Sequence, residues 1–203
     1  MEPTLLPVTN LRVNDYLLIL APHEELAHKI TAVKKEFADT YRLVAPEGIK
    51  PHVGLVKCST WATMEDKIIH RLQHIAMGIR PFKIELKDYG SFPTHSIFIN
   101  ITTKLPVQNL VKEVKELQRL LKTSNENKPY FIDEPNIVIA RKLKPWQYES
   151  GWLEYRHRQF TGRFLADHML LLKKESTARR YQVLRRFDFL NLPVTTRQGE
   201  LAF

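Results

Sequence analysis

Two short segments of similar sequence carry the side chains with the clearest capacity for chemistry. Residues 51–57 read PHVGLVK and residues 135–141 read PNIVIAR, so in each a proline is followed by a polar residue, apolar residues and a final base. The imidazole of His52 can take up or release a proton near neutral pH. Asn136, at the equivalent position 84 residues later, can donate a hydrogen bond but has no proton that titrates.

Four further residues of these segments are candidates for ligand binding. Every second side chain of a β-strand projects from the same face, so Gly54 shares a face with the histidine and Val138 shares one with the asparagine. Lys57 and Arg141 end the two segments, where their positive charges can attract a phosphate. The structural alternative is a packed histidine, an asparagine bonded to backbone groups and two solvated bases at strand ends.

Other kinds of site are less favoured. The chain has 7 glycines and contains neither a glycine-rich phosphate loop nor a nucleophile elbow, and its single cysteine, Cys58, cannot form an internal disulfide. His70 and His74 have the spacing of metal ligands on a helix, but no third ligand is evident, so we predict no metal and no cofactor. His95 and His168 are candidates for a second imidazole, although ordinary surface or core histidines are favoured at both positions.

Most of the positive charge lies in the C-terminal third. The net charge is +9, and between residues 141 and 186 there are 12 lysines and arginines against 4 acidic residues. Such a concentration can attract the phosphates of nucleic acid, and the alternative is a solvated surface with scattered charges. The bases that would form the nucleic-acid patch occur in pairs: Lys173, Lys174, Arg179, Arg180, Arg185 and Arg186.

The composition is that of a folded protein without a membrane span. Of the 203 residues, 43% are hydrophobic and 26% are charged, and no apolar run approaches the roughly 20 residues that a membrane-spanning helix needs. The first residues lack the basic and apolar regions of a signal peptide. We therefore expect a cytoplasmic protein, and we assign no oligomeric state.

The hydrophobic pattern suggests an internal duplication. Each proline-containing segment follows its own strand and helix at a similar distance, which is the signature of a repeat. We predict lobe 1 over residues 15–95, lobe 2 over 96–190 and a tail over 191–203. The expected strands are 16–20, 51–57, 82–87, 96–101, 135–141, 167–172 and 181–189, the expected helices are 26–41, 64–79 and 106–121, and residues 146–160 form a mixed aromatic and polar segment.

These segments resemble the 2H phosphoesterase superfamily, which includes bacterial 2′-5′ RNA ligases and RNA cyclic phosphodiesterases. The hallmark of that superfamily is a pair of H-x-[ST] strand motifs, one per lobe, commonly preceded by proline; the second often reads close to P-H-I-T-I-A-R. The strand and turn over residues 82–92, ending in DYGSF, also resemble the superfamily. The resemblance in element order runs from about residue 15 to residue 189.

The resemblance implies a fold and a site. The fold is α+β and 2′-5′ RNA ligase-like, with two pseudo-symmetric lobes, each a small mainly antiparallel sheet with outer helices, around a central cleft lined by His52 and Asn136. In the superfamily two imidazoles flank a phosphate and transfer protons, and the Ser or Thr hydroxyls hold its oxygens. Here Asn136 stands in place of the second histidine, and Gly54 and Val138 stand in place of the hydroxyl residues.

Three functions remain open at this point. The first is a degenerate member that binds a nucleotide or an RNA phosphate end with little or no catalysis. The second is an active cyclic phosphodiesterase or RNA ligase, a hydrolase or ligase in which His52 is catalytic and a substitute group such as His168 supplies the other proton transfer. The third is a structural or protein-interaction domain.

Overall fold

The computed structural model describes residues 12–43, 50–124 and 127–192. Strands in this part of the chain are β1 (Val13–Leu20), β2 (Val53–Trp61), β3 (Phe82–Phe92), β4 (Ser96–Ile101), β5 (Tyr130–Phe131), β6 (Asn136–Arg141), β7 (Thr161–Ala166), β8 (His168–Lys174) and β9 (Gln182–Asp188). The helices are α1 (Glu24–Thr40), α2 (Glu65–Gly78), α3 (Lys104–Lys115), α4 (Gln118–Leu121) and α5 (Pro145–Tyr155).

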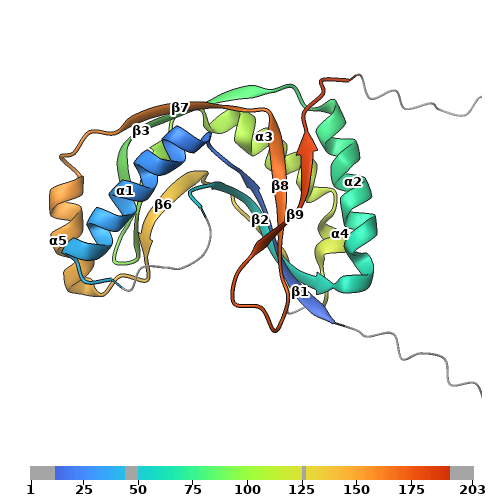
Figure 1. The fold of residues 1–203 in the computed structure, drawn as a ribbon, viewed down its shortest axis with the longest axis horizontal. Coiled ribbons are helices and arrows are strands. Elements are labelled where there is room, and N and C mark those ends of the chain that lie inside the picture. The colour runs from blue at the N-terminus through green and yellow to red at the C-terminus, as the bar shows by residue number, and fades with distance from the viewer. Residues whose placement is uncertain (1–11, 44–49, 125–126, 193–203) are drawn as a thin grey trace, which may run out of the picture.

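The strands form two antiparallel sheets, as the sequence predicts. The first sheet has the order β5-β2-β1-β8-β9 and the second has the order β6-β4-β3-β7. All strand pairs within the two sheets are antiparallel. The ribbon is an arch, with α5 at one end and α2 at the other (Figure 1).

The sheets do not divide the chain at residue 95, the expected boundary between the lobes. Strand β3 precedes this boundary but pairs with β4 and β7 of the second sheet. Strands β8 and β9 follow it but join β1 in the first sheet. The reason is that β7 and β8 lie on either side of a single residue, Asp167, so the chain passes directly from the second sheet to the first.

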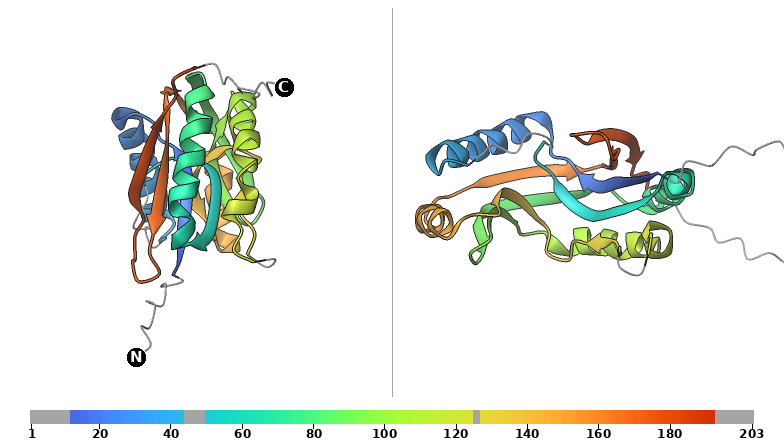
Figure 2. Two further views of the ribbon diagram at one scale, coloured as in Figure 1. Left: turned by 90° about the vertical axis from the view of Figure 1, so that its right-hand side faces the viewer. Right: turned by 90° about the horizontal axis from the view of Figure 1, so that it is seen from below.

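The helices cross between the two halves of the molecule. Helix α1 follows β1 of the first sheet but packs on β6 and β7 of the second, and α3 follows β4 of the second sheet but packs on β2 of the first. Helices α2 and α4 also cover the first sheet, and α5 packs on β4. Seen from below, α1 and α3 lie on opposite sides of the strands and at opposite ends of the molecule (Figure 2).

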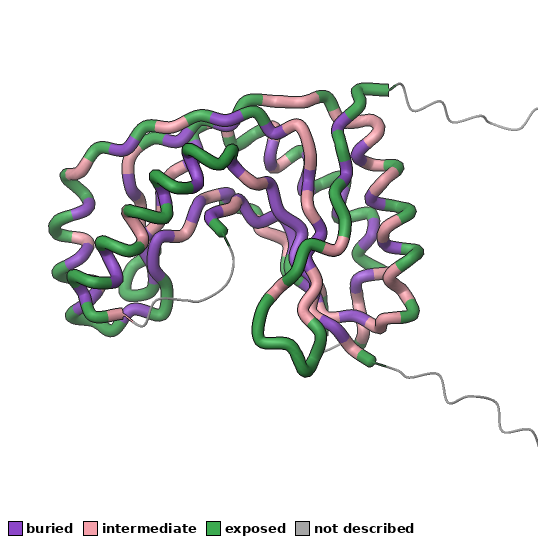
Figure 3. The backbone as a smooth tube through the Cα atoms, in the orientation of Figure 1, coloured by how far each residue is buried: buried purple, intermediate pink, exposed green. Residues whose placement is uncertain are grey.

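Strand β1 is apolar on both faces, which explains its unbroken run of hydrophobic residues. Tyr16 and Leu18 belong to the main core, beneath the helices of the first sheet. Leu17 and Ile19 project from the opposite face, because side chains alternate along a strand. There they form the second apolar cluster, which consists of Leu17, Ile19, Leu170, Leu172 and Tyr181. Figure 3 shows the resulting buried stretch along β1 and β2.

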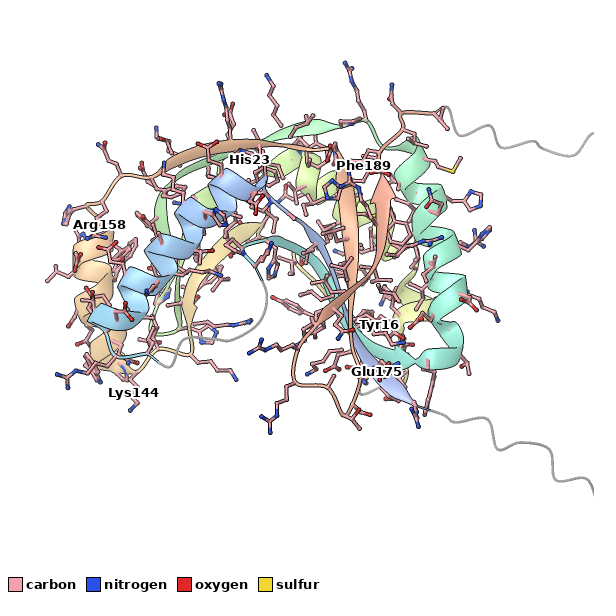
Figure 4. The ribbon with its side chains drawn as sticks, in the orientation of Figure 1. Tyr16, His23, Lys144, Arg158, Glu175 and Phe189 are labelled. Atoms are coloured by element: carbon pink, nitrogen blue, oxygen red, sulfur yellow. The ribbon has the colours of Figure 1, made fainter. Side chains whose placement is uncertain are left out.

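The expected elements were incomplete in the second half. The mixed aromatic segment contains α5, whose Gly151 lies so close to the ring of Phe37 that a Cβ there would be 2.8 Å from it. Arg158, just beyond α5, forms ion pairs with Glu36 at 2.7 Å and Glu154 at 2.9 Å, which tie this end to α1 (Figure 4). The helix expected over 106–121 is divided into α3 and α4. Strands β5 and β7 were also not predicted.

The first two residues of the expected tail are hydrogen-bonded to the end of α2. The backbone N–H groups of Asn191 and Leu192 donate to the carbonyls of Ile79 and Met77, and residues 193–203 lie outside the described part of the chain. Within the described residues, no helix is long and apolar enough to span a membrane.

Candidate functional site

The two proline-containing segments lie at the junction of the sheets. Strand β2 is in the first sheet and β6 is in the second, yet their Cα atoms approach within 8 Å. Pro51 and Pro135 are buried just before these strands. His52 directly precedes β2, and Asn136 is the first residue of β6. The repeat therefore brings equivalent segments of the two halves together.

His52 and Asn136 are oriented by the same kind of hydrogen bond. The Nδ1 of His52 donates to the carbonyl of Lys50 at 2.8 Å, and the Nδ2 of Asn136 donates to the carbonyl of Glu134 at 2.9 Å. In each case the acceptor lies two residues earlier. A proton on Nδ1 leaves the Nε2 of His52 as an unprotonated acceptor. The amide of Asn136 has no atom equivalent to this Nε2.

His52 is uncharged at neutral pH. Burial is the largest cause, and together with the positive charges of Lys34 and Arg141 it lowers the pKa of the imidazole to about 4 despite the opposing hydrogen bond to Lys50. The pKa of Lys34 is itself below its usual value because the ammonium group is buried and lies near Arg141. The charges of Lys34 and Arg141 therefore affect each other and the protonation of His52.

We call Lys34, His52 and Arg141 the inter-sheet site. Lys34 comes from α1, while Arg141 ends β6. Among the described residues, no carboxylate forms an ion pair with Lys34 or Arg141. Two cations that repel each other without a counterion favour the binding of an anion. The neutral imidazole can accept a hydrogen bond from a protonated phosphate or hydroxyl group.

Sequence reasoning missed Lys34. The available signal was its place on α1, four residues after Ile30 and three before Phe37, both of which are fully buried. A lysine at the edge of an apolar helix stripe places its ammonium group near the protein interior.

Apolar side chains occupy the positions where the superfamily motif has hydroxyl groups. Gly54 lies beneath the side chain of Ile132, whose Cδ1 overlaps the place that a Cβ would take. Val138 pairs with Phe98 of β4, and the Phe98 ring is 4.8 Å from that of Phe92. Hydroxyl contacts to a phosphate are therefore absent at both motif positions.

Lys57 lies on the same face of β2 as Gly54. It pairs with Leu17 of β1, and Gly54 pairs with Ile19; both partners belong to the second apolar cluster. The register shifts by one residue between these pairs, so the bulge keeps Gly54 and Lys57 on one face although they are three residues apart. Lys57 is exposed there.

The predicted nucleic-acid patch does not form one continuous surface. Lys173 and Lys174 are consecutive in β8 and project from opposite faces. Their Nζ atoms lie 2.9 Å from carboxylate oxygens of Glu65 and Asp15, respectively, and Glu175, at the start of the β8–β9 turn, is 3.9 Å from Lys173 (Figure 4).

The remaining bases of the patch lie in the turn and in β9. Arg179 and Arg180 are exposed in the β8–β9 turn, and Arg185 is exposed in β9. Arg186 is also exposed, and its Nε lies 2.7 Å from Asp188. The whole basic segment joins the first sheet, so the expectation that it belongs to the second lobe was wrong.

The other histidines have different surroundings. His95 is exposed in the turn between β3 and β4. The Nδ1 of His168 lies 2.5 Å from Asp167. His168 projects from the same face as Leu170, but β1 separates its strand from β2. His70 and His74 lie exposed on α2 with their Nε2 atoms 3.1 Å apart.

Comparisons with known proteins agree with this architecture. Residues 22–178 match the model of the 2′-5′ RNA ligase superfamily. The crystal structure of Escherichia coli LigT complexed with 3′-AMP matches with a TM-score of 0.62 and 16% identity, over 87% of this chain and 98% of that one. The protein TT0787 of Thermus thermophilus matches with a TM-score of 0.57 and 16% identity, over 87% of this chain and 98% of that one. No match was found among curated proteins.

Proposed function

Because the chain belongs to the 2′-5′ RNA ligase superfamily, we propose that its inter-sheet site binds the phosphate at the end of a nucleotide or RNA strand with little or no catalysis. The observation that carries this proposal is the group of Lys34, His52 and Arg141, in which the two cations act on the imidazole and form no ion pair among the described residues. LigT of E. coli was crystallised with 3′-AMP and with phosphate, which is the same class of ligand.

Limited catalysis follows from the loss of one proton-transfer group. Cleavage of a phosphoester needs a group that takes a proton from the attacking oxygen and one that gives a proton to the leaving oxygen. His52 can serve in one of these steps, whereas Asn136 can only hold an oxygen. A general acid or base contributes roughly 10²- to 10⁴-fold in rate, so turnover falls by about that factor even before the missing hydroxyls are considered.

Ligand binding changes the state of His52. A bound phosphate places negative charge beside Lys34 and Arg141 and offsets their effect on the imidazole. The pKa of His52 therefore rises toward neutrality in the complex. Such a pKa suits His52 for one of the two proton transfers, and the other transfer still lacks a titrating group at Asn136.

The experiment compares binding with turnover. We expect a nucleoside 3′-monophosphate to bind in a calorimetric titration, and we expect the wild type to hydrolyse a 2′,3′-cyclic nucleotide slowly or not at all. Asn136→His restores the second imidazole and should raise turnover, while the double variant with His52→Asn should not. Robust turnover by the wild type that is lost in His52→Asn would contradict the proposal. Absence of binding would leave the structural or protein-interaction function.

One observation favours an active enzyme as the second candidate. The carboxylate of Asp167 holds the Nδ1 of His168, which leaves its Nε2 available on the face of the first sheet to which Gly54 and Lys57 belong. The two strands that flank β1 lie about 10 Å apart, so a substrate would have to bridge that distance. Loss of turnover in both His52→Asn and His168→Ala would support this function.

A cytoplasmic location is likewise proposed from the sequence.

A further inference from the structure

Tyr130 and Lys57 form a second group on the face of the first sheet that carries Gly54. Lys57 pairs with Leu17 on one side and with Tyr130 of β5 on the other. Side chains directly opposite each other in an antiparallel pair project from the same face. Tyr130 is 68% exposed, although its neighbour Phe131 is packed against the main core.

Lys57 and Tyr130 lie too far from the inter-sheet site to share one phosphate with it. The five residues from His52 to Lys57 correspond to about 16 Å of extended strand. One phosphate group cannot contact both. A ligand that uses both groups must therefore be longer than a single phosphate, and it must offer a negative charge to Lys57 and a flat apolar surface to Tyr130.

From this arrangement, and resting on the proposed function, we propose that Lys57 and Tyr130 form a second binding subsite, which takes an internal phosphate and a base of a single-stranded RNA. Its terminal phosphate lies among Lys34, His52 and Arg141. The RNA then runs along β2, where Lys57 contacts an internal phosphate and the ring of Tyr130 stacks on a base. Stacking on an aromatic ring beside a basic side chain is how proteins bind single strands without reading their sequence.

The positions of both residues suit this role. Strand β5 is at the edge of the first sheet, so no further strand in the described part of the chain covers Tyr130 on that side. Among the described residues, Lys57 has no ion-pair partner, in contrast to Lys173, Lys174 and Arg186 on the same sheet. Its charge acts on Asp15, whose carboxylate is already paired with Lys174 at 2.9 Å, so the Lys57 ammonium group can still contact a phosphate.

The test compares two ligands on the full chain. The first ligand is a nucleoside 3′-monophosphate, and the second is an RNA of about six nucleotides with a 3′-phosphate. Each is titrated against the wild type and against the variants Tyr130→Ala, Tyr130→Phe and Lys57→Ala. We expect the RNA to bind more tightly than the mononucleotide. Tyr130→Ala should weaken RNA binding about tenfold and Tyr130→Phe should retain it, since stacking needs only the ring. Lys57→Ala should lower the slope of log affinity against log salt by about 0.7.

The controls separate this inference from the proposed function. Mononucleotide affinity should not change in Tyr130→Ala, and Trp146→Ala, which removes a 49% exposed ring from α5, should leave both ligands unaffected. If the mononucleotide binds but the RNA binds no more tightly, or if Tyr130→Ala has no effect on RNA, the inference is overturned and the proposed function stands. If neither ligand binds, both are overturned.

Discussion

His52 and Asn136 make the same hydrogen bond to the backbone, and they differ in what lies beyond it. Both side chains donate to the carbonyl two residues earlier, at 2.8 Å and 2.9 Å. The imidazole extends past this bond to a second nitrogen, while the amide does not. Retention of the orienting bond without the reactive atom is what we expect of a site that binds a ligand and has lost one proton transfer.

The low pKa of His52 predicts a pH-dependent stability. The folded protein has a His52 pKa of about 4, against 6.5 for an ordinary histidine. Between these values the unfolded chain binds a proton at His52 that the folded protein does not bind. The free energy of unfolding therefore falls as the pH falls from 6.5 to 4, by up to about 3 kcal/mol, and this residue causes no pH dependence above that range. Urea unfolding at several pH values measures this contribution.

A matched variant isolates the effect of His52. His52→Asn removes the titrating group and leaves an amide that can donate to Lys50, as Asn136 donates to Glu134. We expect a shallower dependence on pH between 6.5 and 4 than in the wild type. If the two proteins lose stability in parallel over this window, His52 is not the residue responsible.

Lys34 is expected to contribute to the low pKa of His52. Lys34→Met keeps much of the apolar stem and removes the charge that lowers the His52 pKa. We predict that the His52 pKa rises but stays below 6.5, because burial is the larger cause of its low value, as followed by NMR titration of the imidazole, and that phosphate binds several-fold more weakly. Lys35→Met is the control, since Lys35 is the next residue and is exposed. An unchanged His52 pKa in Lys34→Met would show that the two groups are not coupled.

At the scale of elements, the short segment after β5 explains why the first motif has no hydroxyl residue. The backbone N–H of Ile132 donates to the carbonyl of Leu55 at 2.9 Å, which fixes this segment beside β2. The side chain of Ile132 then covers Gly54. Any larger residue at position 54 must displace it.

We predict that Gly54→Thr destabilises the protein and that Ile132→Ala relieves the effect. Threonine favours a strand over glycine by up to about 1 kcal/mol, but overpacking costs roughly 1 to 3 kcal/mol, so the clash should win. Added to the Ile132→Ala background, the same threonine should be neutral or stabilising. Urea unfolding of the four proteins measures this coupling. Equal losses from Gly54→Thr in both backgrounds would place the strain elsewhere.

The elements that the sequence predicted are those with a strong local pattern. Strand β1 is an unbroken apolar run, and α1 and α2 have apolar residues at helical spacing. Helix α5 was missed because its aromatic residues are unevenly spaced, and β5 because it has two residues. Which sheet each strand joins depends on pairing between distant residues, so the positions of β3, β8 and β9 were not accessible from local pattern.

The candidate site was predictable only where it repeats. His52 and Asn136 were found because the surrounding residues recur 84 positions later. Lys34 has no counterpart in a motif, and its role depends on α1 crossing to β6 of the other sheet. The paired bases of β8 were misjudged as one patch, although the alternation of strand side chains already argues that neighbours point to opposite faces.

At the scale of the whole molecule, the two sheets have equivalent architectures. Apart from β5, which lies on the other side of β2, the first sheet has the order β2-β1-β8-β9 outward from its motif strand, and the second has the order β6-β4-β3-β7. Helices α1 and α3, which follow the equivalent strands β1 and β4, each pack on the opposite sheet. Because of this exchange neither half has a complete core, and we expect the two halves to unfold together.

The distribution of charge over the molecule predicts a modest dependence of RNA binding on salt. Three bases of the predicted patch, Lys173, Lys174 and Arg186, already lie against carboxylates at 2.7–2.9 Å. Each phosphate contact adds about 0.7 to the slope of log affinity against log salt for a single strand. The observed slope should therefore reflect a few contacts, fewer than the net charge of +9 suggests.

The β8–β9 turn supplies the last test of this idea. The double variant Arg179→Ala/Arg180→Ala should weaken binding to RNA of any sequence and flatten the slope by about 1, because contacts to phosphates carry no sequence information. Lys67→Ala/Arg71→Ala removes two exposed charges from α2, which packs on β9, and changes the net charge equally. If the two double variants lose the same affinity, RNA responds to the total charge of the protein. If only Arg179→Ala/Arg180→Ala loses affinity, the β8–β9 turn contacts the RNA.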